Sequence, residues 1–185
     1  AGEGLPSTVV SAYPASTSIP GRLLAMARAG IAPGGMRAVF AGMDAVHYPL
    51  TVPVPRPRSV PVAITLHDLQ HRDLPDMFPR GERLFRRLAY DRAATGADAV
   101  VVPSAFVRDR ATALLGLPEE RLHVIPLGVD LDRFTPGTGE RSPFLLYPAR
   151  PWPHKGHERL LAALRLLRAR RPELELVLTG AGTER

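Results

Sequence analysis

Short, almost wholly apolar segments alternate with amphipathic ones along most of this 185-residue chain. The apolar segments are Val62–Leu66, Ala99–Val102, Leu122–Ile125, Phe144–Tyr147 and Leu174–Leu178. A strand that is apolar at nearly every position is covered on both faces, which is typical of parallel sheets flanked by helices. The alternation therefore predicts an α/β fold built on parallel sheets.

Helical segments with recognisable ends separate these strands. Ser104 is expected to cap a helix over 105–115, and Gly116 is expected to stop it. A second helix is expected over 157–170, where leucines recur at helical spacing. Two strand-helix-strand units follow one another along the chain.

A further helix is expected over 80–95. Its apolar positions recur at helical spacing and predict a face packed on the protein, with arginines on the outer face. These positions are Leu84, Phe85, Leu88 and Ala89.

Two stretches are expected to lie outside this regular pattern. Residues 49–61 hold five prolines, which exclude a central strand or helix and predict an exposed loop. Residues 1–43 offer a helix candidate over 21–29 and no functional motif.

The composition excludes several classes of protein. Cysteine is absent, which removes disulfide frameworks, thiolate metal sites and cysteine nucleophiles. No apolar run approaches the roughly 18 residues of a membrane helix, and the first residues lack the pattern of a signal peptide. A cytoplasmic location is the expectation. The net charge of +6 permits binding to nucleic acid, anionic lipid or phosphorylated small molecules without choosing among them.

One lysine, Lys155, stands among 24 basic residues. A lysine that persists in an arginine-rich chain suggests a task for its compact ammonium group. Lys155 lies in the loop 149–156, which leaves a predicted strand and enters a predicted helix. Arg150, Lys155 and the free N–H groups of the helix could converge on one anion, such as a diphosphate. The alternative is that Arg150 caps a carbonyl and Lys155 is merely solvated.

His67 and Asp68 follow the apolar strand at Val62–Leu66 and are the catalytic candidates of the first half. An imidazole at a strand end can donate a hydrogen bond or accept a proton near neutral pH. Because His47 and His71 lie nearby in the sequence, a metal site is an alternative. The absence of cysteine and of a helical His-x-x-x-His pair disfavours it. A histidine with a purely structural role is the alternative.

Two other features of the second half admit two readings each. Gly180 and Gly182 follow the last predicted strand, where they would let the backbone approach a nucleotide or simply form a turn. Trp152 would either stack on a ring or plug its loop onto the sheet.

Four segments, taken in order, resemble the successive motifs of glycosyltransferase family 4, the group 1 glycosyltransferases. They are Ile64–His71, Ala97–Arg108, His123–Phe134 and Tyr147–Glu158. The resemblance implies a GT-B architecture of two Rossmann-like domains that face each other across a cleft. It implies an acceptor-side N-terminal domain over 1–137, with its start missing, and the beginning of a donor-nucleotide-binding domain over 138–185.

The activity implied by the resemblance is that of a retaining hexosyltransferase. It would move a hexose such as mannose or glucose from a UDP- or GDP-linked donor to a hydroxyl of a glycan, lipid or small molecule, with no metal cofactor required. The family pattern assigns Arg150, Lys155 and Gly156 to the donor diphosphate and places Gly180 and Gly182 near the nucleotide. It places His67 beside the donor sugar, while Asp68 orients the loop or contacts the acceptor.

Alternatives remain from other functional classes. The chain would be a non-catalytic phosphate- or nucleotide-binding α/β module, or an inactive fragment of a longer transferase, if the rest of the donor pocket were missing. A polyanion binder would use the arginines of the 80–92 region, but no exposed aromatic side chains are expected between them, so nucleic acid is not the expected partner. If the acceptor is a lipid, the same basic helix could serve as a peripheral membrane contact.

Overall fold

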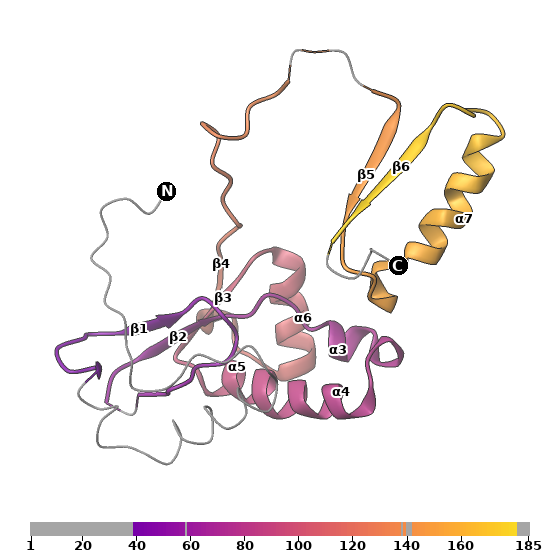
Figure 1. Cartoon of the computed structure of the whole chain (residues 1–185). Coiled ribbons are helices and arrows are strands. Elements are labelled where there is room, and N and C mark those ends of the chain that lie inside the picture. The colour runs from indigo at the N-terminus through magenta and orange to yellow at the C-terminus, as the bar shows by residue number, and fades with distance from the viewer. Residues whose placement is uncertain (1–38, 58, 138, 140–141, 181–185) are drawn as a thin grey trace. The chain divides into compact units, whose positions relative to one another are not determined.

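The computed structural model describes residues 39–57, 59–137, 139 and 142–180. The chain divides into two compact units, Ala1–Asp130 and Leu131–Arg185, and each is described by itself (Figure 1). Every strand pair in both units is parallel, which confirms the predicted α/β class. The helix candidate over 21–29 and Gly182 lie outside the described residues. The assignment of acceptor-side and donor-side domains at 1–137 and 138–185 stays a prediction.

The first unit is built on a four-stranded parallel sheet in the order β1-β2-β3-β4. Its strands are β1 (Val46–Tyr48), β2 (Val62–Thr65), β3 (Ala99–Val102) and β4 (Leu122–Val124). In the register of the central pair, Ile64 lies beside Val100, and neither side chain is exposed. These two strands bury their side chains most completely, as their apolar sequences predict.

Helices and helical turns connect these strands. They are α3 (Gln70–Asp73), the 3-10 turn η1 (Pro75–Met77), α4 (Arg80–Arg86), the π-helical turn η2 (Arg87–Asp91), α5 (Arg92–Gly96), α6 (Ala105–Leu115) and the 3-10 turn η3 (Glu119–Arg121). Ser104 caps α6 by accepting a 3.3 Å hydrogen bond from the Val107 amide, and Gly116 ends it at a φ of 65°. Both predicted ends of this helix are confirmed.

Small residues bring the helices close to the sheet. Ala94 from α5 and Ala111 from α6 are completely buried against the core that Ile64, Val100 and Val102 form. Full burial of a valine or isoleucine side chain, as at Val100 and Ile64, stabilises the fold by about 1.5–3 kcal/mol relative to exposure.

The prediction that the apolar face of the 80–95 helix packs on the protein is wrong. Leu84, Phe85 and Leu88 are 58%, 38% and 49% exposed, and the core contact is made further along, by residues such as Ala93 and Ala94. A four-residue strand is only about 13 Å long, whereas a helix of this length extends about 25 Å. The sheet is therefore too short to cover the beginning of this helix.

The described residues of the proline-rich loop over 49–61 form no helix or strand, as predicted, but they are not simply exposed. Thr51, Pro53 and Pro57 are buried, and the Thr51 hydroxyl donates a 3.1 Å hydrogen bond to the carbonyl of Thr65. The Tyr48 hydroxyl donates to the Pro55 carbonyl. These contacts pack the loop against the sheet, which the proline count alone could not foresee.

The second unit is a single strand-helix-strand motif. Its elements are β5 (Phe144–Pro148), the 3-10 turn η4 (Pro153–Lys155), α7 (His157–Arg168) and β6 (Glu175–Thr179), which pairs in parallel with β5. On α7, Leu160 and Leu164 are half-buried whereas Leu161 and Leu167 are exposed. Two strands cover only part of the leucine face predicted from the sequence. Within the described part of the chain, no helix has the length and hydropathy needed to cross a membrane.

Candidate functional site

The loop between β5 and α7 carries the predicted anion-binding residues. It contains two tight turns, each closed by a 2.8 Å backbone hydrogen bond. The Trp152 amide donates to the Arg150 carbonyl, and the Lys155 amide donates to the Trp152 carbonyl. Gly156 then adopts a φ of 69°, a left-handed conformation that favours glycine, and α7 begins. The loop therefore turns within a few residues from the end of a strand into the start of a helix.

Side chains at both ends of this loop fix its backbone. The Tyr147 hydroxyl donates a 2.6 Å hydrogen bond to the Lys155 carbonyl. His157 Nε2 lies 3.3 Å from the Ala149 carbonyl, and because a carbonyl only accepts, this nitrogen carries the proton. The rings of Tyr147 and His157 meet edge to face at 5.1 Å. The loop is thus braced from β5 and from the first turn of α7.

Gly180, directly after β6, lies against the same loop. A Cβ atom on Gly180 would lie 2.7 Å from the Ala149 carbonyl oxygen and 3.2 Å from the Arg150 amide nitrogen, and the φ of Gly180 is 141°. Both the space and the backbone conformation require glycine. The structure therefore gives Gly180 a packing role beside Arg150; its predicted proximity to a nucleotide stays a prediction.

The charged groups of the loop are available to a ligand. Arg150 and Lys155 are exposed, and neither side chain forms an ion pair with the described residues. The Arg150 guanidinium lies 5.9 Å from the centroid of the exposed Trp152 ring. Among the described residues, no side chain caps the N-terminus of α7, and uncapped N–H groups of this kind can bind an anion. One acidic residue, Glu158, lies in that first turn.

In the first unit, the loop after β2 carries the predicted catalytic pair. His67 is exposed, and its Nε2 lies 2.8 Å from the Pro49 carbonyl, so Nε2 carries the proton. In a neutral ring, Nδ1 is then a free acceptor. Asp68 Oδ1 accepts a 3.1 Å hydrogen bond from the Gln70 amide and lies 3.9 Å from Arg86 Nη1. The Asp68 carboxylate thus participates in the local structure of its loop.

The three neighbouring histidines do not converge. His47 Nε2 lies 3.0 Å from the Thr65 hydroxyl, His67 contacts Pro49, and His71 Nε2 lies 2.9 Å from Asp91. The described residues contain no group of three or more potential ligands that could hold a metal ion.

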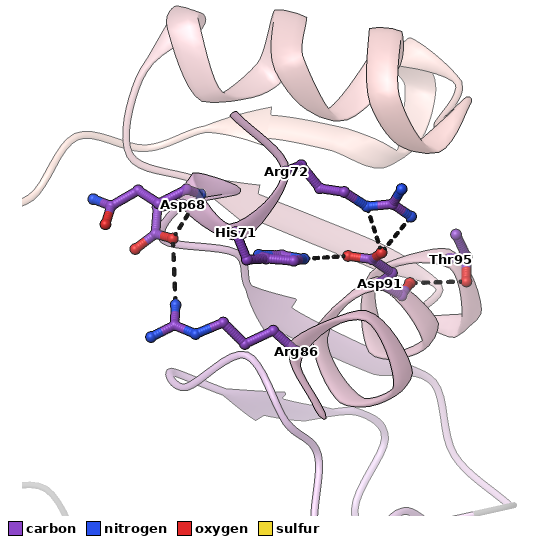
Figure 2. A network of polar contacts seen from close by, with 7 residues as sticks. Asp68, His71, Arg72, Arg86, Asp91 and Thr95 are labelled. Atoms are coloured by element: carbon purple, nitrogen blue, oxygen red, sulfur yellow. Dashed lines mark hydrogen bonds and ion pairs between the residues drawn. The ribbon is translucent and has the colours of Figure 1, made fainter. Parts of the chain in front are cut away.

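A network that no sequence motif indicates joins α3, which follows the His67 loop, to Asp91 of η2 (Figure 2). Asp91 accepts hydrogen bonds from His71 and Arg72, and the Thr95 hydroxyl donates to the Asp91 carbonyl at 2.9 Å. The sequence suggests His71 only as a metal ligand. No local pattern pairs Asp91 with residues about twenty positions earlier, so the sequence offered no signal for this contact.

In parallel α/β units, ligands bind outside the carboxyl ends of the strands, and both the His67 loop and the loop with Arg150 and Lys155 follow such strand ends. Residues 9–133, which make up most of the chain, match the sequence profile of Glycosyltransferase Family 4. The chain belongs to this family, as the ordered motifs predicted, and the parallel α/β units are consistent with a Rossmann-like half of a GT-B protein.

Individual relatives point the same way. The chain is 35% identical over 108 residues to a GDP-mannose-dependent alpha-(1-6)-phosphatidylinositol monomannoside mannosyltransferase of Mycolicibacterium smegmatis, covering 52% of this chain and 28% of the relative. It is 28% identical over 183 residues to the protein of that name from Mycobacterium tuberculosis, covering 92% of this chain and 45% of the relative.

A D-inositol 3-phosphate glycosyltransferase of Xylanimonas cellulosilytica is 28% identical over 151 residues, which is 69% of this chain and 34% of the relative. The chain spans less than half the length of each of these curated relatives. Together with the family match, these likenesses support a role in glycosyl transfer.

Proposed function

We propose that this chain contributes to a hexosyltransferase that moves mannose from GDP-mannose to a hydroxyl of an inositol-containing acceptor. Family membership supports the glycosyl transfer, and two kinds of relative share an inositol in the name of their acceptor. The observation that carries the donor half of the proposal is the braced loop with two exposed cations, Arg150 and Lys155, at the uncapped N-terminus of α7.

The donor diphosphate would bind at this loop. As the bond between the anomeric carbon and the diphosphate breaks, negative charge grows on the leaving phosphate oxygen. Fixed cations and helix N–H groups stabilise that charge without needing to reorganise. Lys155 would act as a point charge, whereas the Arg150 guanidinium can bind two phosphate oxygens. In this proposal these groups, rather than a bound metal, neutralise the leaving group.

His67 would contact the sugar or the acceptor. With its Nε2 proton directed to the Pro49 carbonyl, Nδ1 is the ring nitrogen left to accept a hydrogen bond from a hydroxyl. The acceptor oxygen forms the new bond to the anomeric carbon, and its proton passes to the leaving diphosphate. The family resemblance leads us to propose retention of the anomeric configuration.

A lipid acceptor would also require contact with a membrane surface. Leu84, Phe85 and Leu88 lie exposed on the α4–η2 segment, and the exposed arginines nearby are Arg80, Arg87 and Arg92. A groove of about 350 Å³ runs beside Phe85 and Leu88. Apolar side chains next to cations are suited to a surface of anionic lipid.

The membrane proposal is tested by sedimentation with vesicles. The double variant Phe85→Ser and Leu88→Ser should lose binding to vesicles that contain phosphatidylinositol, while wild-type protein should prefer these vesicles to pure phosphatidylcholine. Phe106→Ser, which changes an exposed phenylalanine on α6, is the control. Equal loss in the control, or no preference of the wild type for anionic vesicles, would contradict the proposal.

The transfer proposal is tested by incubating the full-length protein with GDP-mannose and phosphatidylinositol monomannoside, with UDP-glucose as the competing donor. We expect a mannosylated lipid whose new linkage has the α configuration of the donor by NMR. Binding of GDP without any transfer would instead favour the non-catalytic nucleotide-binding alternative.

A further inference from the structure

The short helix α3, which directly follows the His67 loop, cannot be stable by itself. It has four residues, and a single helical turn forms too few hydrogen bonds to offset the cost of ordering it. Its position therefore depends on contacts with other elements. Among those contacts, the ion pairs come from two sides.

On one side, a single buried carboxylate holds two consecutive residues of α3. Asp91 is 7% exposed; its Oδ1 accepts from His71 Nε2 at 2.9 Å, and its Oδ2 accepts from Arg72 Nε at 2.9 Å and from Nη2 at 2.6 Å. His71 is completely buried. A carboxylate and an imidazole at this depth are stable only while they remain paired, so the contact is rigid.

The continuous helical segment α4–η2, which carries Asp91, also contacts the start of the His67 loop through Arg86. Arg86 lies 3.9 Å from Asp68, and its guanidinium stacks over Phe78 and Tyr90 at 4.8 and 5.3 Å from the ring centroids. From the other side, Arg110 of α6 donates a 2.8 Å hydrogen bond to Asp73 at the end of α3. The residues from Asp68 to Asp73 are thus held at their start, middle and end.

The π-helical turn η2 allows Arg86 and Asp91 to face the same side of one helical segment, so that Arg86 approaches Asp68 while Asp91 binds His71. Residues five apart on an α-helix differ in direction by about 140°, so Arg86 and Asp91 would face different sides. In a π-helical turn the hydrogen bonds join residues five apart, which places such residues one above the other. Figure 2 shows Arg86 and Asp91 both directed at the segment that carries Asp68 and His71.

We propose that Asp91 is a positioning residue that acts through His71 and Arg72 to hold the His67 loop in its reactive arrangement. This inference rests on the proposed function, and of the two groups named there it takes the acceptor as the one that His67 contacts. Asp91 itself is buried and paired, so its effect is indirect. Loss of its charge should loosen α3 and the loop before it, while the donor loop of the second unit is unaffected.

The test compares Asp91→Asn in the full-length protein with Asp109→Asn, which removes the carboxylate of an exposed pair with Arg108 on α6. The first readout is hydrogen exchange of the amides of residues 72–74, which donate to Leu69 and Gln70. We expect about tenfold faster exchange in Asp91→Asn, from the loss of charge-assisted hydrogen bonds, and no change in the control. Unchanged exchange in Asp91→Asn overturns the proposal.

The second readout is steady-state transfer from GDP-mannose to phosphatidylinositol monomannoside. Asp91→Asn should raise the acceptor KM at least about fivefold and leave the donor KM within about twofold. If the acceptor KM and the donor KM rose by the same factor and the Tm fell, the role of Asp91 would be merely structural and the proposal would be overturned. If the wild-type protein transfers nothing, the proposed function fails, whereas the exchange experiment still decides whether Asp91 orders α3.

A milder variant covers the case in which Asp91→Asn does not fold. Arg72→Gln keeps the His71–Asp91 pair and changes a side chain that is 32% exposed. Arg72→Gln should also speed amide exchange in α3 and raise the acceptor KM, but by smaller factors than Asp91→Asn. Arg72→Lys should bring the acceptor KM part of the way back to the wild-type value, because lysine returns the positive charge without the planar set of donors of a guanidinium. An Arg72→Gln protein with wild-type exchange and wild-type acceptor KM would overturn the proposal.

Discussion

The hydroxyl of Tyr147 donates a 2.6 Å hydrogen bond to the backbone carbonyl of Lys155, eight residues further along the chain. Tyr147 belongs to β5, whereas Lys155 ends the turn that precedes α7. The strand therefore holds the backbone of the one lysine in the sequence, while its ammonium group stays exposed. A fixed backbone with a free charged group is the arrangement that a preorganised anion site requires.

Tyr147→Phe should weaken donor binding without disrupting the unit. The substitution removes the hydrogen bond to Lys155 but keeps the ring that meets His157. A net hydrogen bond contributes about 0.5–1.5 kcal/mol, which corresponds to a roughly two- to tenfold weaker Kd for GDP. Calorimetry of the two proteins measures the difference. Tyr90→Phe, which removes a hydroxyl in the other unit, is the control, and an equal loss there would contradict this account.

Gly180→Ala should disturb the loop beside Arg150. Its new methyl group would lie 2.7 Å from the Ala149 carbonyl oxygen, and the positive φ adds backbone strain of about 1–3 kcal/mol. We expect a lower Tm and weaker GDP binding. Gly137→Ala is the matched control, because a Cβ there has open space. A Gly180→Ala protein with the Tm and GDP affinity of the wild type would show that the loop does not depend on this contact.

Ser104→Ala should affect stability and leave ligand binding unchanged. The Ser104 hydroxyl accepts from the Val107 amide at the start of α6, and loss of such a cap costs about 0.5–2 kcal/mol. Denaturant unfolding of the wild type and the variant measures the difference. Since glycine is nearly as good a cap as serine, Ser104→Gly should lose only a few tenths of a kcal/mol. A role for Ser104 in chemistry would appear as lost transfer activity at unchanged stability.

Features that depend on neighbouring residues could be predicted from the sequence. The ends of α6 follow from Ser104 and Gly116, because a cap and a left-handed glycine act within one turn. The strands around Ile64 and Val100 follow from their apolar runs, because such a run can be stable only between two covering layers.

Features that depend on distant residues could not be predicted. The helix α3 is too short to leave a periodic pattern, and it exists because Asp91 and Arg110 hold it from other elements. The exposure of Leu84 and Leu88 follows from the length of the strands beneath the helix, which its own periodicity does not contain. At the candidate site, the sequence predicted Arg150 and Lys155 from their position, but it could not predict the Tyr147 brace.

The central claim is that the loop carrying Arg150 and Lys155 binds the diphosphate of the donor. Calorimetric titration of GDP into the full-length wild-type protein, Lys155→Ala and Arg165→Ala tests it most directly, since Arg165→Ala removes one exposed positive charge from α7 away from the loop. We predict at least about tenfold weaker binding for Lys155→Ala, from the loss of charge-assisted hydrogen bonds, and binding within about twofold of the wild type for Arg165→Ala. Wild-type affinity in Lys155→Ala would contradict the account.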